Sequence, residues 1–168
     1  MKKIIVNTGR SESKFNIEKV EEKYKAKFVG QLCLRTAGGG WHGDDCGDVY
    51  YQETPPVEGY SNYFALIIQH GTTYITSGAS AVEGIINGVI ANDGEIIYSR
   101  YRHDYRTSTD GSTFIDGGRD YVRGGATGRY INMKIVDGEF YQLEDEDMGF
   151  DEDESAPSVA EEDQSKEP

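Results

Sequence analysis

The sequence predicts one α+β domain, residues 1–143, in which an N-terminal amphipathic helix packs on a twisted, mainly antiparallel β-sheet. A disordered acidic tail is predicted at residues 144–168. Three observations lead to this class. The 168 residues suffice for one core but not for two domains of ordinary size. Helical apolar spacing occurs near the N-terminus, and short glycine-bearing turns join successive strand-like segments without strand–helix alternation.

The helix is predicted within residues 11–25. Ser11 or Ser13 is available there as an N-cap. Apolar side chains recur near helical spacing at Phe15, Ile17, Val20 and Tyr24.

The strands follow the helix, with glycine-rich text between them. A first strand is predicted at residues 27–36, and a loop at residues 38–48 separates it from the others. Two hairpins have clear turn residues, one around Asn92–Gly94 and one around Asp137–Gly138. Residues 78–84 fit either a turn of helix or a loop. Further strands are predicted at residues 48–52, 62–69, 72–76, 85–91, 95–103, 130–136 and 139–143.

The negative charge is concentrated at the C-terminus. The chain has net charge -13, of which residues 144–168 contribute twelve acidic side chains against one lysine. Few apolar groups and strong self-repulsion predict disorder there. The tail is either a solubilising end, or a mimic of the nucleic-acid backbone, or an acidic bait for a basic host protein. Because the body is nearly neutral, a nucleic-acid polymer is not expected as a ligand.

The sequence indicates a cytoplasmic protein without a membrane segment. Cys33 and Cys46 do not form a CxxC pair, and a reducing compartment is the simpler expectation. The apolar run within the first ten residues is too short for the core of a signal peptide. The apolar run at residues 64–68 is too short for a membrane span.

The segment with the most chemistry is residues 99–123, which holds five of the eight arginines. If residues 95–103 form a strand, Arg100 and Arg102 share a face about 7 Å apart. Arginine forks suit a phosphate, tyrosine rings can stack on a base, and glycine backbone can approach an anion. We therefore predict a phosphorylated small-molecule site. Its candidate residues are Arg100, Arg102, His103, Asp104, Tyr105, Phe114, Asp116, Gly117, Gly118, Arg119, Asp120, Tyr121 and Arg123.

The same segment also fits a purely structural role. Four aspartates lie among the five arginines, so the segment has a net charge near +1. Cross-strand ion pairs could therefore neutralise the guanidinium groups without any ligand.

Two short patterns in this segment resemble a known family. They are S-R-x-R-H-D-Y, from Ser99 to Tyr105, and D-G-G-x-D-Y-x-R, from Asp116 to Arg123. In this form they resemble the phage Thoeris anti-defence proteins of the first type. The resemblance implies an oligomeric phage or mobile-element protein in the host cytoplasm. It also implies a sponge that sequesters a cyclic ADP-ribose signal without catalysis, its arginines holding the diphosphate and its aromatic rings the adenine.

Other chemistry is less well supported by the sequence. Trp41–Asp48 gathers His42, Asp44, Asp45 and Cys46, a weak metal signal, and could instead form a lid or a solvated connection. No cofactor or metal is expected. Two alternative functions stay open: an acidic inhibitor of a host factor acting through the tail, and a nucleotide-processing enzyme that uses His103.

Overall fold

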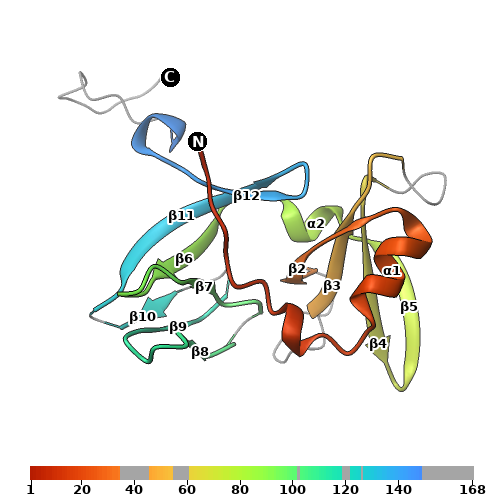
Figure 1. Ribbon diagram of the computed structural model, residues 1–168, viewed down its shortest axis with the longest axis horizontal. Coiled ribbons are helices and arrows are strands. Elements are labelled where there is room, and N and C mark those ends of the chain that lie inside the picture. Colours follow the sequence, from red (N-terminus) through yellow and green to blue (C-terminus); the bar gives the residue numbers. More distant parts are fainter. Residues whose placement is uncertain (35–45, 55–60, 102, 119–121, 126, 149–168) are drawn as a thin grey trace, which may run out of the picture.

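The described part of the chain forms three antiparallel sheets in place of the single sheet predicted from the sequence (Figure 1). The α+β class with mainly antiparallel strands is confirmed. The computed structural model describes residues 1–34, 46–54, 61–101, 103–118, 122–125 and 127–148. In it, two larger sheets face each other and the N-terminal segment runs down between them (Figure 1).

The first sheet has four strands in the order of the chain. The turn between the last two strands, His70–Gly71, has φ of 52° and 77°, which is the left-handed backbone of a two-residue hairpin turn. All neighbouring strands pair antiparallel, with a bulge between Phe28 and Gly30. The strands are β2 (Lys27–Cys33), β3 (Cys46–Tyr51), β4 (Tyr63–Gln69) and β5 (Thr72–Ser77).

An α-helix, α1 (Ile17–Tyr24), covers one face of this sheet, and a short 3-10 turn, η1 (Arg10–Glu12), precedes it. Ile17 is buried against Tyr50 and Phe64, which lie on that face. Because α1 begins at Ile17, residues 11–16 of the predicted helix are not α-helical.

The N-cap of α1 is Asn16, not Ser11 or Ser13 as predicted. Its side chain accepts the Lys19 N–H at 3.1 Å. The Ser13 hydroxyl is engaged differently: it accepts the Phe15 N–H at 3.0 Å and donates to the Asp48 carboxylate of β3. This tie to β3 holds the chain extended before the helix begins.

The second sheet has five strands and contains both predicted hairpins. Gly94 (φ 96°) supplies the left-handed backbone in the first turn, and Asp137 (φ 49°) with Gly138 (φ 79°) in the second. The order is β1 (Lys2–Lys3), β12 (Glu139–Gln142), β11 (Arg129–Val136), β6 (Ile86–Ile90) and β7 (Ile96–Tyr98).

The faces of the five-stranded sheet pack on different partners. Tyr98 and Met133 point toward the four-stranded sheet and form the main core with Val49. On the opposite face Val89 and Ile97 pack on Ile115 of a small third sheet. That sheet has the order β10 (Arg123–Gly124), β9 (Phe114–Asp116) and β8 (Arg106–Thr107).

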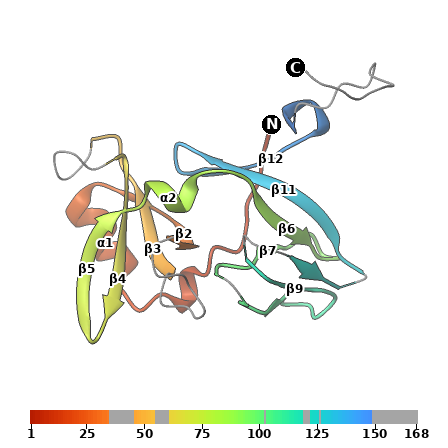
Figure 2. The same cartoon turned by 180° about the vertical axis from the view of Figure 1, so that it is seen from behind.

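Two short helical turns complete the described chain. The first, α2 (Ala79–Val82), lies at the connection between the two larger sheets (Figure 2). The second, η3 (Asp145–Met148), falls inside the predicted tail, where Asp147 pairs with the Met1 amino group at 3.0 Å. Residues 145–148 are therefore not disordered as predicted, and the rest of the predicted tail, residues 149–168, lies outside the described residues. Among the described helices, none is long and apolar enough to cross a membrane.

The contact between the two larger sheets predicts the effect of a methyl group at Gly30. A Cβ there would lie 2.6 Å from the Tyr98 hydroxyl, which donates to the Gln31 carbonyl at 3.1 Å. We expect Gly30→Ala to lower the free energy of unfolding by about 1–3 kcal/mol. In a Tyr98→Phe background the same change should cost less, because the clashing hydroxyl is gone. Equal costs in both backgrounds, measured by urea denaturation, would contradict this packing.

Candidate functional site

The strand predicted at residues 95–103 ends at Tyr98, and the chain then turns sharply. The Asp104 carboxylate accepts the Arg100 N–H at 2.9 Å, and the Asp104 N–H donates to the Tyr101 carbonyl at 3.0 Å. His103 has φ 68°. The predicted strand is therefore wrong beyond Tyr98, because a side-chain acceptor replaces the ladder partner of the Arg100 N–H. Arg102 lies outside the described residues.

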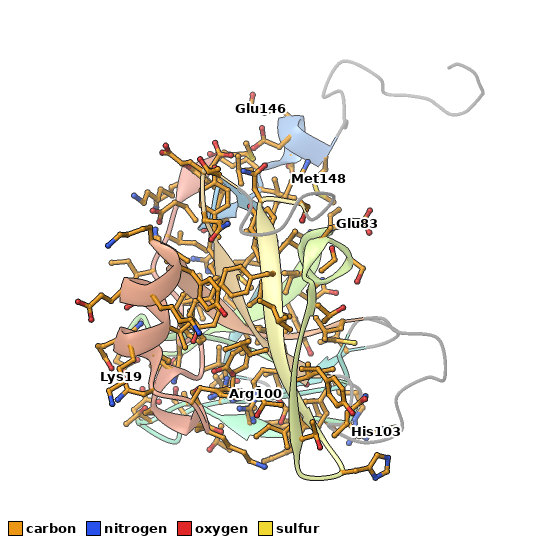
Figure 3. All side chains as sticks on the ribbon, turned by 90° about the vertical axis from the view of Figure 1, so that its right-hand side faces the viewer. Lys19, Glu83, Arg100, His103, Glu146 and Met148 are labelled. Carbon is orange, nitrogen blue, oxygen red and sulfur yellow. The ribbon has the colours of Figure 1, made fainter. Side chains whose placement is uncertain are left out.

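The Arg100 side chain forms the centre of a polar network that joins three parts of the chain. Its Nε and Nη2 donate to the two oxygens of Asp104 at 2.7 and 3.1 Å. Its Nη1 donates to Glu12 at 2.8 Å and to the Gln31 side chain at 2.6 Å. The side chain is 11% exposed, and in Figure 3 it lies within the outline of the molecule, whereas Lys19 of α1 lies at the margin. Burial opposes its charge, but hydrogen bonding to Asp104 and the charges of Asp104 and Glu12 raise the pKa of Arg100 above its ordinary value.

Glu12 bridges two arginines whose side chains are largely, but not fully, buried. Its second oxygen accepts from Nη2 of Arg106 at 2.8 Å, and the Arg106 side chain is only 9% exposed. Nη1 of Arg106 is buried and has no hydrogen-bond partner among the described residues. The cluster of Glu12, Arg100, Asp104 and Arg106 thus balances two positive and two negative charges and leaves one guanidinium nitrogen unsatisfied. We call it the Glu12 bridge.

The two halves of residues 99–123, which we call the arginine segment, are hydrogen-bonded to each other. The His103 N–H donates to the Gly117 carbonyl at 2.9 Å. Gly117 and Gly118 are buried with φ of 138° and 108°, a conformation that side-chain-bearing residues rarely adopt. These glycines therefore have a structural use, and the anion contact predicted for them stays a prediction.

The other described candidates lie on the outer face of the three-stranded sheet, which is the face opposite Ile115. Tyr105 and Phe114 stack there with ring centroids 5.2 Å apart. Asp116 pairs with Arg123 at 3.0 Å, and the Arg123 side chain is 69% exposed. Arg106 is paired with the buried Ile115 and shares its inward face. The described candidates therefore divide between an inner arginine cluster and an outer aromatic face. Arg119, Asp120 and Tyr121 lie outside the described residues.

A cavity of about 390 Å³ opens beside the Glu12 bridge. This volume is within the range of small-molecule pockets. Apolar walls come from Phe15 and from Leu66, Ile67 and Ile68 of β4. The polar lining consists of Glu12, Lys14, Gln31, Asp48, Arg100 and Tyr101.

The cavity has a buried carboxylate at its base. Asp48 of β3 accepts from the Ser13 hydroxyl and from Nε2 of Gln31 at 3.3 Å. Burial raises the pKa of Asp48, and the two hydrogen bonds only partly offset this effect. Gln31 therefore connects the buried carboxylate to Arg100 through its two amide atoms.

Several residues of this site were not identified from the sequence. Glu12, Gln31, Asp48 and Arg106 were not among the predicted ligand-binding residues. Their contacts join positions far apart in the chain, and no local spacing pattern indicates such pairs. Trp41, His42, Asp44 and Asp45 lie outside the described residues. Within the described ranges, no cluster of His, Cys, Asp and Glu could hold a metal ion.

Comparisons with known proteins identify no relative of this chain. No protein-family model matches the sequence, and neither the curated proteins nor the solved structures give a significant match.

The environment of Asp48 predicts a specific pH dependence of stability. Because its pKa is higher in the folded chain than in the unfolded chain, folding is favoured below the ordinary pKa and this contribution is lost as pH rises through the folded pKa. We expect Asp48→Asn to raise the midpoint of thermal unfolding at pH 7 and to change it little at pH 3. Calorimetric scans of both proteins between these pH values test this. A stabilising effect that is the same at pH 3 and pH 7 would contradict the assignment.

Proposed function

We propose that the chain binds and sequesters a phosphorylated nucleotide without catalysis, at the Glu12 bridge and the adjoining cavity. The observation that carries this proposal is the position of the Glu12 carboxylate between two largely buried guanidinium groups. A phosphate shares the preference of a carboxylate for paired arginine donors and offers additional acceptor oxygens. Glu12 thus marks an anion position within the fold.

Three features support displacement of Glu12 by a ligand. The Glu12 side chain is 48% exposed, so it can leave the cluster for water. The unsatisfied Nη1 of Arg106 would gain an acceptor from the additional phosphate oxygens. Arg100 remains fixed by Asp104 during the exchange, so one arginine is positioned in advance.

The cavity offers contacts for the rest of a nucleotide. Phe15 and Tyr101 provide ring surface, and Lys14 is an exposed cation at its rim. The amide of Gln31 and the carboxylate of Asp48 are polar groups that can distinguish a base or a ribose. The cyclic ADP-ribose class is proposed from the sequence resemblance, as are the phage origin and the anti-defence role.

Calorimetry with matched variants tests the site. The probes are cyclic ADP-ribose isomers, cyclic dinucleotides and inorganic pyrophosphate. We expect Glu12→Gln to bind the preferred probe about tenfold more tightly, because the competing carboxylate is removed, and Arg106→Lys to bind at least about tenfold more weakly. Glu18→Gln is the control, since Glu18 pairs with the surface residue Arg10 at 2.9 Å and is 77% exposed. Absence of binding heat with every probe, for the native chain and for Glu12→Gln, would refute the function.

Two further experiments test the two alternative functions. Denaturing the complex and recovering the probe unchanged favours sequestration, whereas an altered product supports an enzyme that uses His103. Removal of residues 149–168 tests an inhibitor that acts through the acidic tail. This truncation keeps the pairing of Asp147 with Met1 and leaves the described fold complete.

A further inference from the structure

The edge strand β5 has no charged side chain, and no described segment is hydrogen-bonded to its outer edge. It is the last strand of the four-stranded sheet and is largely exposed. The twenty residues 63–82 contain no Asp, Glu, Lys or Arg, although 28% of the chain is charged. Exposed, uncharged edge strands rich in β-branched residues are templates for pairing with another strand.

The opposite edge of the same sheet shows how a protected edge is built. On β2 the Phe28 N–H donates to the Glu21 side chain at 3.0 Å, and the Gln31 N–H donates to the Thr8 carbonyl at 3.1 Å. The Leu34 carbonyl just beyond β2 accepts from the Ser80 hydroxyl. In the five-stranded sheet, the edge strand β1 consists of two lysines.

The hairpin turn determines which groups of β5 point outward. His70–Gly71 is a two-residue turn, so the flanking pair Gln69–Thr72 exchanges hydrogen bonds, as do every second pair after it. The backbone groups of Thr73, Ile75 and Ser77 must therefore point away from β4. Among the described residues, no hydrogen bond reaches the outward backbone N–H and C=O groups of Thr73 and Ile75.

We propose that β5 pairs antiparallel with β5 of a second copy of this chain, around a two-fold axis at Ile75. With a two-fold axis normal to the sheet at Ile75, whose backbone groups point outward, Ile75 forms a hydrogen-bonded pair with its own copy and both copies offer matching donors and acceptors. Centring on Ile75 uses the whole strand: Ile75 faces its own copy, and Thr73 faces Ser77 of the second copy. The two four-stranded sheets then become continuous.

The second copy is favoured as the occupant by charge and by packing. A chain of net charge -13 repels itself, so self-association needs a surface without acidic groups, which this edge provides. Ile75 packs at the margin of the apolar cluster under α1, so pairing across the axis extends that cluster from one copy to the other. Tyr74, 48% exposed on the other face, would lie opposite Thr76 of the second copy. This proposal is independent of the nucleotide site.

Sedimentation velocity between about 1 and about 100 μM tests the interface with charge-paired variants. The native chain should sediment increasingly as a dimer. Thr73→Lys combined with Ser77→Lys places like charges opposite each other twice, and should raise the dimer dissociation constant at least about tenfold. Thr73→Lys combined with Ser77→Glu places opposite charges at both positions and should keep the dissociation constant within about threefold. Gln69→Lys, on the neighbouring strand β4, is the control and should leave it unchanged.

The outcomes decide the proposal clearly. Added lysines reduce the net charge of the chain, so a loss of dimer in the double-lysine variant cannot come from general repulsion. Circular dichroism of each variant shows whether it is folded. In the native dimer, the Ile75 amide should exchange with solvent more slowly as concentration rises. A native chain that is monomeric at about 100 μM, or a dimer equally stable in both double variants, would overturn the interface.

Discussion

The ion pair between Arg100 and Asp104 is the interaction on which the rest of the site depends. Asp104 is 4% exposed and binds both the backbone and the guanidinium group of Arg100. A buried charge is stable only when it is paired and hydrogen-bonded, so the two residues fix each other. Their pairing turns the chain after β7 and directs the rest of the guanidinium toward Glu12 and Gln31. Residues from η1, β2 and the arginine segment are thereby held in one place.

This arrangement connects the structural and the functional interpretations of the arginine segment. The sequence left open whether its arginines bind a ligand or pair with aspartates. The geometry separates them: Arg100 with Asp104 is a structural pair, Arg123 with Asp116 is an exposed pair, and Arg106 retains an unsatisfied donor beside a half-exposed glutamate. The proposed ligand site therefore uses fewer residues of the segment 99–123 than were predicted. It lies on the inner side of the third sheet. The stacked pair Tyr105–Phe114 lies on the other side.

Local signals explain which parts of the fold could be predicted. The hairpins at Gly94 and at Asp137–Gly138 were predicted because left-handed backbone has a strong residue preference. The prediction of a strand through Arg100 was wrong because Asp104, four residues later, accepts the Arg100 backbone N–H. The alternation of side chains in the sequence does not reveal this competition. Division into three sheets could not be predicted either, since it depends on Ile115 packing against Val89 and Ile97. Glu12 lies 88 residues from Arg100, beyond any spacing rule.

The central claim is tested most directly by comparing the stability of Asp104→Asn and Asp116→Asn in urea. Both changes remove one carboxylate charge from an arginine pair in the same segment. The first pair is buried and the second exposed on its arginine side, with side-chain exposures of 11% for Arg100 and 69% for Arg123. We expect Asp104→Asn to lower the free energy of unfolding by about 2–4 kcal/mol, and Asp116→Asn by less than about 1 kcal/mol. Equal losses, or a larger loss at Asp116, would contradict the account.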